Sequence, residues 1–156
     1  MKITIADIQK LKNNTKPFSV ITAYDYPTAL IVNEINIPMV LVGDSASMVV
    51  YGYENTIPIT IDELLLITKA VSRGINKALI IADMPFMSYQ PSVEEAVRNA
   101  GQLIKHGKAN AVKIEGGAEY AQHVIKMVQS GIPVMGHVGL KPQSLLTDSG
   151  YKIHGK

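Results

Sequence analysis

The amino-acid sequence predicts an α/β fold with a parallel sheet, and two patterns indicate it. Short runs of β-branched and other apolar residues recur along the chain, and segments with helical spacing separate them. No hairpin signal joins one apolar run to the next, so successive strands are expected to run in the same direction with helices between them.

Five apolar runs are the predicted strands. Their hydrophobicity is continuous rather than alternating, which is typical of strands covered on both faces. Proline, glycine or acidic residues punctuate them. The runs are FSVITA (18–23), PMVLVG (38–43), ALIIAD (78–83), AVKIE (111–115) and PVMGHV (133–138).

The spacing of apolar residues between these runs predicts helices. A short helix precedes the first strand, and the next begins near Pro27, a residue favoured in a first turn. Two helices open on the pattern of a capping box, at Thr60–Glu63 and at Ser92–Glu95. In order, the predicted helices lie at about 4–11, at 27–35, from 60 to Gly74, from 92 to Gly107 and from 118 to Gly131.

Two segments stand outside this alternation. Residues 44–60 are predicted to be a long loop of functional length, and KPQSLLTDSGYKIHGK a loop-like tail without a helix. A (β/α)₈ barrel takes ~250 residues, so five βα units in 156 residues are too few to close one. Residues 1–156 are therefore expected to form a single domain, either a smaller open sheet or an incomplete barrel.

Composition excludes several classes of protein. The net charge is +2 and the basic residues are scattered, which gives no support for binding to nucleic acid or an anionic membrane. Cysteine is absent, so disulfides and thiolate sites are excluded. The apolar runs are far shorter than the ~20 residues of a spanning helix. Together with an N-terminus that lacks a signal-peptide pattern, this predicts a cytoplasmic protein.

Polar residues gather where the predicted strands end. Ligands bind at the carboxyl ends of strands in both barrels and open α/β sheets. A single aspartate there can instead cap the next helix or begin a turn, but acids on three successive strands indicate a shared site. The strand ends carry Tyr24-Asp25, Asp44-Ser45, Asp83, Glu115 and His137.

Three of these acids suit a hard cation. Asp44, Asp83 and Glu115 are the candidate ligands, because carboxylate oxygens are preferred by Mg²⁺, which also keeps water in its coordination shell. Lys113 lies two residues before Glu115 and should point to the same face of its strand. It either only pairs with Glu115 or also neutralises the carboxylate of a substrate.

The remaining polar candidates keep two interpretations each. His137 is either a core histidine bonded to the backbone or a catalytic group, and Ser45 either caps a turn or binds a ligand. Surface roles suffice for His106, His123 and His154. A nucleotide cofactor has no support, since neither a Walker loop nor a GxGxxG motif is present.

Six motifs along the chain match a known family in order and spacing. They are TAYDYPTA, LVGDSASMVVYGYENTIPIT, ADMPFMSYQ, VKIEGG, GHVGLKPQS and GYKIHGK. With these motifs the chain resembles ketopantoate hydroxymethyltransferase (3-methyl-2-oxobutanoate hydroxymethyltransferase). The resemblance implies a (β/α)₈ TIM barrel, here truncated to about five βα units with a short N-terminal helix. It also implies bound Mg²⁺ on Asp44, Asp83 and Glu115, and substrate contacts from Asp44, Ser45, Asp83 and Lys113.

The reaction implied by the resemblance is a one-carbon transfer in pantothenate biosynthesis. A hydroxymethyl group passes from 5,10-methylenetetrahydrofolate to 3-methyl-2-oxobutanoate and gives 2-dehydropantoate. Mg²⁺ would chelate the keto oxygen and the carboxylate, which makes the proton on C3 removable. Family members assemble as homo-oligomers, typically decamers.

One family feature has no counterpart here. The catalytic base of the family is a glutamate on a later strand, expected beyond residue 156, so we assign no catalytic residue within this sequence. Two alternatives to a functional enzyme portion stay open. One is an inactive truncated remnant that keeps the metal ligands, and the other is a related Mg²⁺-dependent enzyme of 2-oxo acids.

Overall fold

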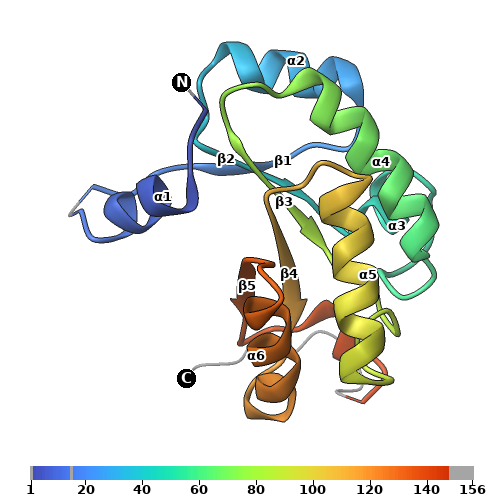
Figure 1. The fold of residues 1–156 in the computed structure, drawn as a ribbon. Coiled ribbons are helices and arrows are strands. Elements are labelled where there is room, and N and C mark those ends of the chain that lie inside the picture. The colour runs from blue at the N-terminus through green and yellow to red at the C-terminus, as the bar shows by residue number, and fades with distance from the viewer. Residues whose placement is uncertain (1, 15, 148–156) are drawn as a thin grey trace.

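The chain folds as the predicted succession of parallel strands and helices (Figure 1). The structure is a computed structural model and describes residues 2–14 and 16–147. All five strands lie within the predicted runs and form one parallel sheet in the order β1-β2-β3-β4-β5. The strands are β1 (Val20–Thr22), β2 (Met39–Val42), β3 (Leu79–Asp83), β4 (Ala111–Glu115) and β5 (Val134–His137).

The five predicted helices are present, and two further helical turns occur where loops were expected. Within the described residues, no helix has the length and hydrophobicity needed to cross a membrane. The helices are α1 (Ile5–Lys12), α2 (Tyr26–Glu34), α3 (Ala46–Val49), α4 (Ile61–Gly74), α5 (Val93–Lys105) and α6 (Ala121–Gln129), with 3₁₀ turns η1 (Ala118–Tyr120) and η2 (Pro142–Ser144).

The prediction of a plain loop over residues 44–60 is wrong at its start, because α3 follows β2 almost directly. Its turn is closed by backbone bonds from Val49 N–H to Ser45 O and from Val50 N–H to Ala46 O, at 3.0 and 2.9 Å. Paired valines favour strands over helices, which explains why the sequence pattern concealed this turn. The prediction of a loop-like tail after β5 is also wrong at Pro142–Ser144, where η2 forms.

One of the two predicted capping boxes is complete. At α4, Thr60 Oγ1 accepts the N–H of Glu63, and the Glu63 carboxylate accepts the N–H of Thr60 at 2.8 Å. At α5 only half of the motif forms. Ser92 Oγ accepts the N–H of Glu95, but the Glu95 carboxylate lies 3.2 Å from Arg98 Nη2. The arginine one turn along the helix thus competes with the cap for this carboxylate.

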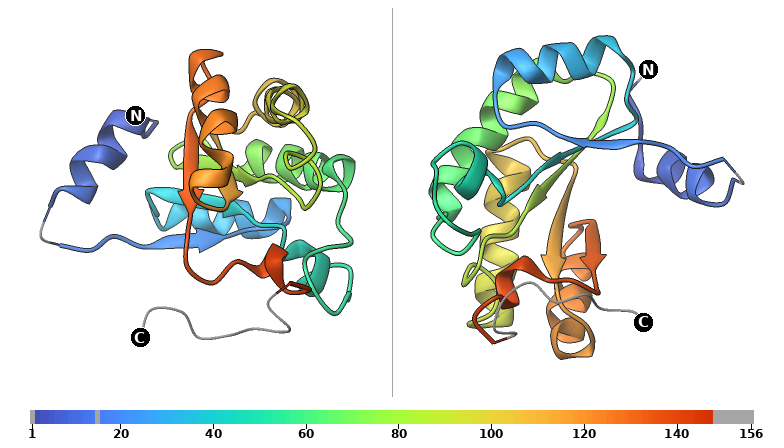
Figure 2. Two further views of the ribbon diagram at one scale, coloured as in Figure 1. Left: turned by 90° about the horizontal axis from the view of Figure 1, so that it is seen from below. Right: turned by 180° about the vertical axis from the view of Figure 1, so that it is seen from behind.

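The two faces of the sheet have different coverings (Figures 1 and 2). Helices α2, α4, α5 and α6 pack on one face, where Val40, Ile80 and Val112 are fully buried. The opposite face carries a smaller apolar cluster around Leu79 and Ile81, which α1 covers. Side chains alternate along a strand, so Asp83 projects from β3 on the same face as these two residues. The face under α1 therefore becomes charged toward the carboxyl ends of the strands.

The direct contact between α2 and α4 gives a test of the packing. A Cβ added at Gly74, the last residue of α4, would lie 2.7 Å from Ala29 Cβ and 3.1 Å from the Leu30 backbone nitrogen. We expect Gly74→Ala to lower the free energy of unfolding by about 1–3 kcal/mol, because the backbone of α2 must shift.

Gly101→Ala in α5 is the matched control. An added Cβ there has open space, so higher helix propensity should stabilise the chain by about 0.5–1 kcal/mol. Urea unfolding followed by circular dichroism measures both variants. Equal effects at the two glycines would contradict the tight contact between the two helices.

Candidate active site

The five predicted site residues lie together at the carboxyl ends of the strands. A pocket of about 340 Å³ opens there, and its wall includes the apolar side chains of Leu41 and Met135. The fold brings the polar residues together because β2, β3 and β4 are adjacent and parallel. The predicted residues in the wall are Asp44, Ser45, Asp83, Lys113 and Glu115, and His137 joins them.

Lys113 is the lysine in the wall of the pocket, and it pairs with two of the site carboxylates. Its Nζ lies 3.0 Å from Asp83 Oδ1 and 3.6 Å from Glu115 Oε1. The predicted orientation of Lys113 and Glu115 to one face is confirmed by this contact. Asp83 was not predicted as a partner, and it lies closer because strand register places it directly beside Lys113. The interpretation that Lys113 pairs only with Glu115 is therefore wrong, because Lys113 also pairs with Asp83.

Burial and mutual charge set the protonation of this group. Burial raises the pKa of Asp83 to about 7, against the lowering effect of Lys113 and with a further rise from Asp44. Burial likewise raises the pKa of Asp44. Burial alone would lower the pKa of Lys113, but the neighbouring carboxylates outweigh it and raise that pKa. The lysine is thus charged at neutral pH, while Asp83 is close to its titration point.

The Asp44 carboxylate belongs to the site and does not cap a helix. Its backbone N–H donates to Asp83 Oδ2 at 3.0 Å, and its Oδ2 accepts from Gln143 Nε2 at 2.8 Å. Asp25, at the end of the first strand, behaves differently. Its carboxylate accepts the N–H of Thr28 at 2.7 Å and caps α2. The capping interpretation therefore applies to Asp25 and fails for Asp44.

Ser45 presents its hydroxyl to a side chain and not to the helix that it precedes. Its Oγ lies 2.8 Å from Tyr24 Oη, and it makes no capping bond to α3. Gly43 permits this approach, since an added Cβ would lie 2.7 Å from Ser45 Oγ. The cap interpretation of Ser45 is wrong, and its hydroxyl is left at the wall of the pocket.

His137 does not fit the interpretation of a core histidine bonded to the backbone. Its Nδ1 lies 3.2 Å from Glu115 Oε1, and a third of its side chain is exposed. Strand register explains the contact, because His137 is the β5 partner of Glu115. His137 therefore holds one oxygen of a site carboxylate.

The surface role expected for the other histidines is confirmed for His106, which is exposed. His123 instead has buried ring nitrogens, and its ring packs edge-on against Tyr120 with centroids 5.2 Å apart. His154 lies outside the described residues, as does the predicted motif GYKIHGK.

Comparison with known proteins decides the family. A family model described as Ketopantoate hydroxymethyltransferase matches residues 2–156. The chain belongs to the ketopantoate hydroxymethyltransferase family. Proteins named 3-methyl-2-oxobutanoate hydroxymethyltransferase from Syntrophus aciditrophicus and Clostridium botulinum are 52% and 53% identical to it. These alignments cover 99% and 100% of the chain but 57% of each relative, so the chain spans little more than half their length.

Solved structures confirm the predicted fold class. Phosphoenolpyruvate phosphomutase from Streptomyces platensis superposes with a TM-score of 0.68 at 12% identity, over 85% of this chain and 53% of that one. A 2,3-dimethylmalate lyase of the PEP mutase/isocitrate lyase superfamily gives 0.67 at 16% identity, over 94% and 55%. At such identities the likeness shows the fold alone, a parallel five-stranded α/β sheet arranged as in part of a TIM barrel.

Tyr89 and Gln143 also contact the site, although neither was predicted from the sequence. Tyr89, on the loop after β3, is almost fully buried, and its hydroxyl accepts the N–H of Glu115 at 3.1 Å. The same hydroxyl lies 2.9 Å from Glu115 O and from Gln143 Oε1, so its single proton is shared between two acceptors. Burial raises the pKa of Tyr89, which keeps that proton in place. Both residues lie in motifs of the family resemblance, ADMPFMSYQ and GHVGLKPQS, and that position was their only signal in the sequence.

The carboxylates suit a cation that uses few protein ligands. Within residues 2–14 and 16–147, no three acidic or histidine side chains converge as a ready-made metal cage. Mg²⁺ commonly takes one or two carboxylates and fills its shell with water and substrate oxygens. Asp83 Oδ1 is buried and accepts no well-formed hydrogen bond from the described residues, although Lys113 Nζ lies 3.0 Å away. That oxygen and the oxygen of Asp44 that Gln143 leaves free fit such an ion.

Glu115 is more heavily engaged than the two aspartates. Its Oε1 contacts Lys113 and His137, and its Oε2 accepts the backbone N–H of Gln143 at 3.1 Å. Its predicted role as a metal ligand stays a prediction. The observed contacts show that it holds Lys113, His137 and the turn η2 in place.

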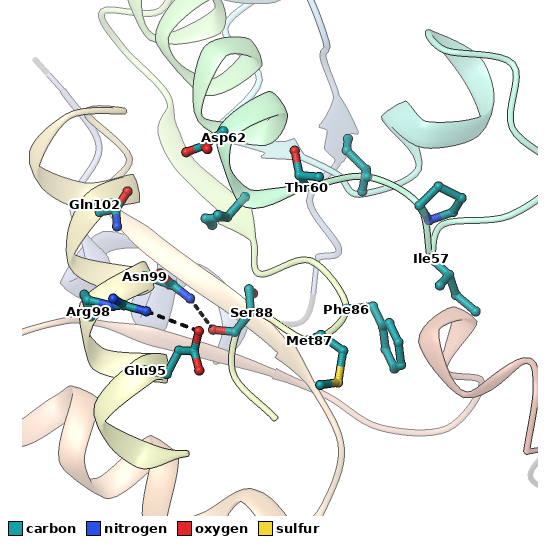
Figure 3. Close-up of a pocket in the computed structure, with 13 residues that line it drawn as sticks. Ile57, Thr60, Asp62, Phe86, Met87, Ser88, Glu95, Arg98, Asn99 and Gln102 are labelled. Atoms are coloured by element: carbon teal, nitrogen blue, oxygen red, sulfur yellow. Dashed lines mark hydrogen bonds and ion pairs between the residues drawn. The ribbon is translucent and has the colours of Figure 1, made fainter. Parts of the chain in front are cut away.

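A second pocket, of about 520 Å³, lies outside this cluster (Figure 3). It is bounded by the start of α4, the loop after β3 and one side of α5, and it contains none of the predicted site residues. Four of its polar residues pair with one another. Arg98 pairs with Glu95, and Asn99 Nδ2 donates to Ser88 O at 2.7 Å. The carboxyl-end pocket is therefore the candidate site.

The pKa of Asp83 gives a prediction about stability. It is about 7 in the folded chain against the ordinary 3.8, so the folded state holds this proton more tightly than the unfolded state. The resulting stabilisation is complete below about pH 4 and is lost as pH rises through about 7.

In metal-free buffer, we expect wild-type stability to fall across this window relative to Asp83→Asn, which cannot titrate. The slope should approach ~1.4 kcal/mol per pH unit, the value for one proton. Urea unfolding at a series of pH values measures the difference. Parallel stability curves for the two proteins would show that Asp83 titrates normally.

Proposed function

We propose that the chain supplies the part of a hydroxymethyltransferase that binds Mg²⁺ and a 2-oxo acid. The enzyme would transfer a hydroxymethyl group from 5,10-methylenetetrahydrofolate to 3-methyl-2-oxobutanoate and form 2-dehydropantoate in pantothenate biosynthesis. The observation that carries the proposal is the buried group of Asp44, Asp83 and Lys113 at the strand ends. It occurs in a chain about half identical to proteins named for this activity.

The proposed metal ligands are Asp44, Asp83 and Glu115. Two buried aspartates with raised pKa values are poorly stabilised as anions by protein groups alone. A divalent cation would favour their ionised forms and offset the cost of burying them. When bound there, Mg²⁺ polarises the keto oxygen of the substrate and makes the proton on C3 more acidic.

The other groups of the pocket suit the remaining parts of the substrate. The Lys113 ammonium and the Ser45 hydroxyl are proposed to bind the substrate carboxylate, one by charge and one as a hydrogen-bond donor. Tyr24 holds the Ser45 hydroxyl at 2.8 Å and limits its rotation. Leu41 and Met135 give the wall an apolar part that suits a branched alkyl group.

Two parts of the proposal rest on the family resemblance alone, the folate donor and assembly as a decamer-like homo-oligomer. The cytoplasmic location stays a prediction from the sequence pattern. The general base stays expected beyond residue 156, so we assign none here. The alternative of a related Mg²⁺-dependent enzyme has less support, because relatives at 52% and 53% identity carry this one name.

Magnesium binding tests the ligand set. Asp83→Asn should weaken the affinity for Mg²⁺ at least about 10-fold, since an anionic oxygen ligand is lost while the side-chain shape is kept. Asp62→Asn is the control, because Asp62 is exposed at the start of α4 and outside the pocket. Isothermal titration calorimetry at pH 8 measures both affinities. Equal losses in the two variants would mean that the ligand set is wrong.

Proton exchange tests the reaction. We propose a chimaera in which residues 1–156 are continued by the remaining sequence of the Syntrophus aciditrophicus relative. With Mg²⁺ in D₂O it should exchange the C3 proton of 3-methyl-2-oxobutanoate, as followed by ¹H NMR. Asp83→Asn should slow the exchange by on the order of 10²-fold, because stabilisation of developing negative charge is lost.

The relative itself and the 156-residue chain are the controls for this experiment. The chain alone should not exchange the proton, because no general base is assigned within it. A chimaera that folds but is inactive beside an active relative would refute the proposed substrate chemistry of these residues. Exchange by the chain alone would place a base within residues 1–156.

A further inference from the structure

Gln143 is a buried polar side chain that hydrogen-bonds to four residues around the site. It lies in η2, the turn that follows β5, and only 6% of it is exposed. Pro142 occupies the first position of this turn, where its missing N–H costs no hydrogen bond. The turn carries the amide into the carboxylate cluster from a segment 99 residues beyond Asp44.

The orientation of the Gln143 amide is fixed by its neighbours. Nε2 donates to Asp44 Oδ2 at 2.8 Å and to Met84 O at 2.9 Å. A backbone carbonyl can only accept, so a flipped amide would place two oxygens in contact there. On the other side, Oε1 lies 2.9 Å from Tyr89 Oη and 3.1 Å from Gln90 Nε2. Both hydrogens and both lone pairs of the amide therefore have partners.

We propose that Gln143 is a positioning residue for the metal site. Gln143 Nε2 donates to Asp44 Oδ2 and so occupies one oxygen of this carboxylate. The other oxygen is then left to coordinate the cation. Partners behind a metal ligand fix its orientation in this way and are needed for full affinity. This inference rests on the proposed function, because it assumes that Asp44 is a ligand of Mg²⁺.

A neutral amide suits this position better than a charged group. A lysine would place a second cation beside Asp44, where it would repel the metal, and a glutamate would repel the Asp44 carboxylate. Attachment of the turn does not require the amide, since the backbone N–H of Gln143 already donates to Glu115 Oε2 at 3.1 Å. The turn is therefore attached to the site even without the bond from Gln143 Nε2 to Asp44.

The test compares Mg²⁺ affinity in two glutamine variants. Gln143→Met keeps the length of the side chain but cannot hydrogen-bond, and Gln122→Met makes the same change at an exposed position of α6. Calorimetric titration of the folded proteins should show a roughly 10–100-fold loss of affinity for Gln143→Met. Gln122→Met should bind as the wild type does. Wild-type affinity in Gln143→Met would overturn the proposal.

A second measurement uses the wild-type chain and does not depend on the folding of a variant. The side-chain amide resonances of Gln143 in ¹H–¹⁵N spectra should shift when Mg²⁺ is added, and those of Gln122 should not. Unmoved Gln143 resonances at saturating Mg²⁺ would also overturn the proposal. If the wild-type chain does not bind Mg²⁺, the metal site itself is refuted. That outcome differs from a failure of the Gln143 proposal, because it requires no substitution.

Discussion

The charge of Lys113 is the constraint on which the rest of the site depends. Asp83 and Glu115 are almost fully buried, and each lies within 4 Å of its ammonium. Burying an ionised carboxylate without a partner is costly, so these acids require a cation on the same face of the sheet. Register supplies it, since Lys113 is the β4 partner of Asp83 and two residues before Glu115. A one-residue shift of β4 would turn Lys113 and Glu115 together toward the helices and leave Asp83 without its cation.

One face of the sheet has two parts, an apolar part at the amino ends of the strands and a charged part at their carboxyl ends. At the amino ends of the strands, Leu79 and Ile81 pack beneath α1. Farther along, the same alternating positions carry Asp83 on β3 and Lys113 on β4. The helices on the opposite face bury the main core. Substitutions beneath α1 are thus expected to act on folding, whereas those at the strand ends act on the site.

The sequence was most informative where local rules decide the outcome. Continuous apolar runs located all five strands, and the polar residues at their ends included Asp44, Asp83 and Glu115. Such local rules could not predict contacts that depend on strand register or on loops distant in the sequence. Neither the proximity of Asp83 to Lys113 nor that of His137 to Glu115 follows from spacing along a single strand. Helix α3 was not predicted, because Val49 and the Val50 that follows it are β-branched and favour a strand.

Gln143 shows why the tail-like segment was the hardest part to interpret. Nothing local in the letters KPQS distinguishes a buried glutamine from a solvated one, because its partners lie 28, 54 and 99 residues away. Each contact joins η2 to the end of a different strand or loop, so in the folded chain the turn packs against the ends of β2, β3 and β4 together. The orientation of Asp44 therefore depends on the segment after β5 as well as on its own strand. In the proposed enzyme, the Mg²⁺ site thus relies on this turn, although both aspartates come from earlier strands.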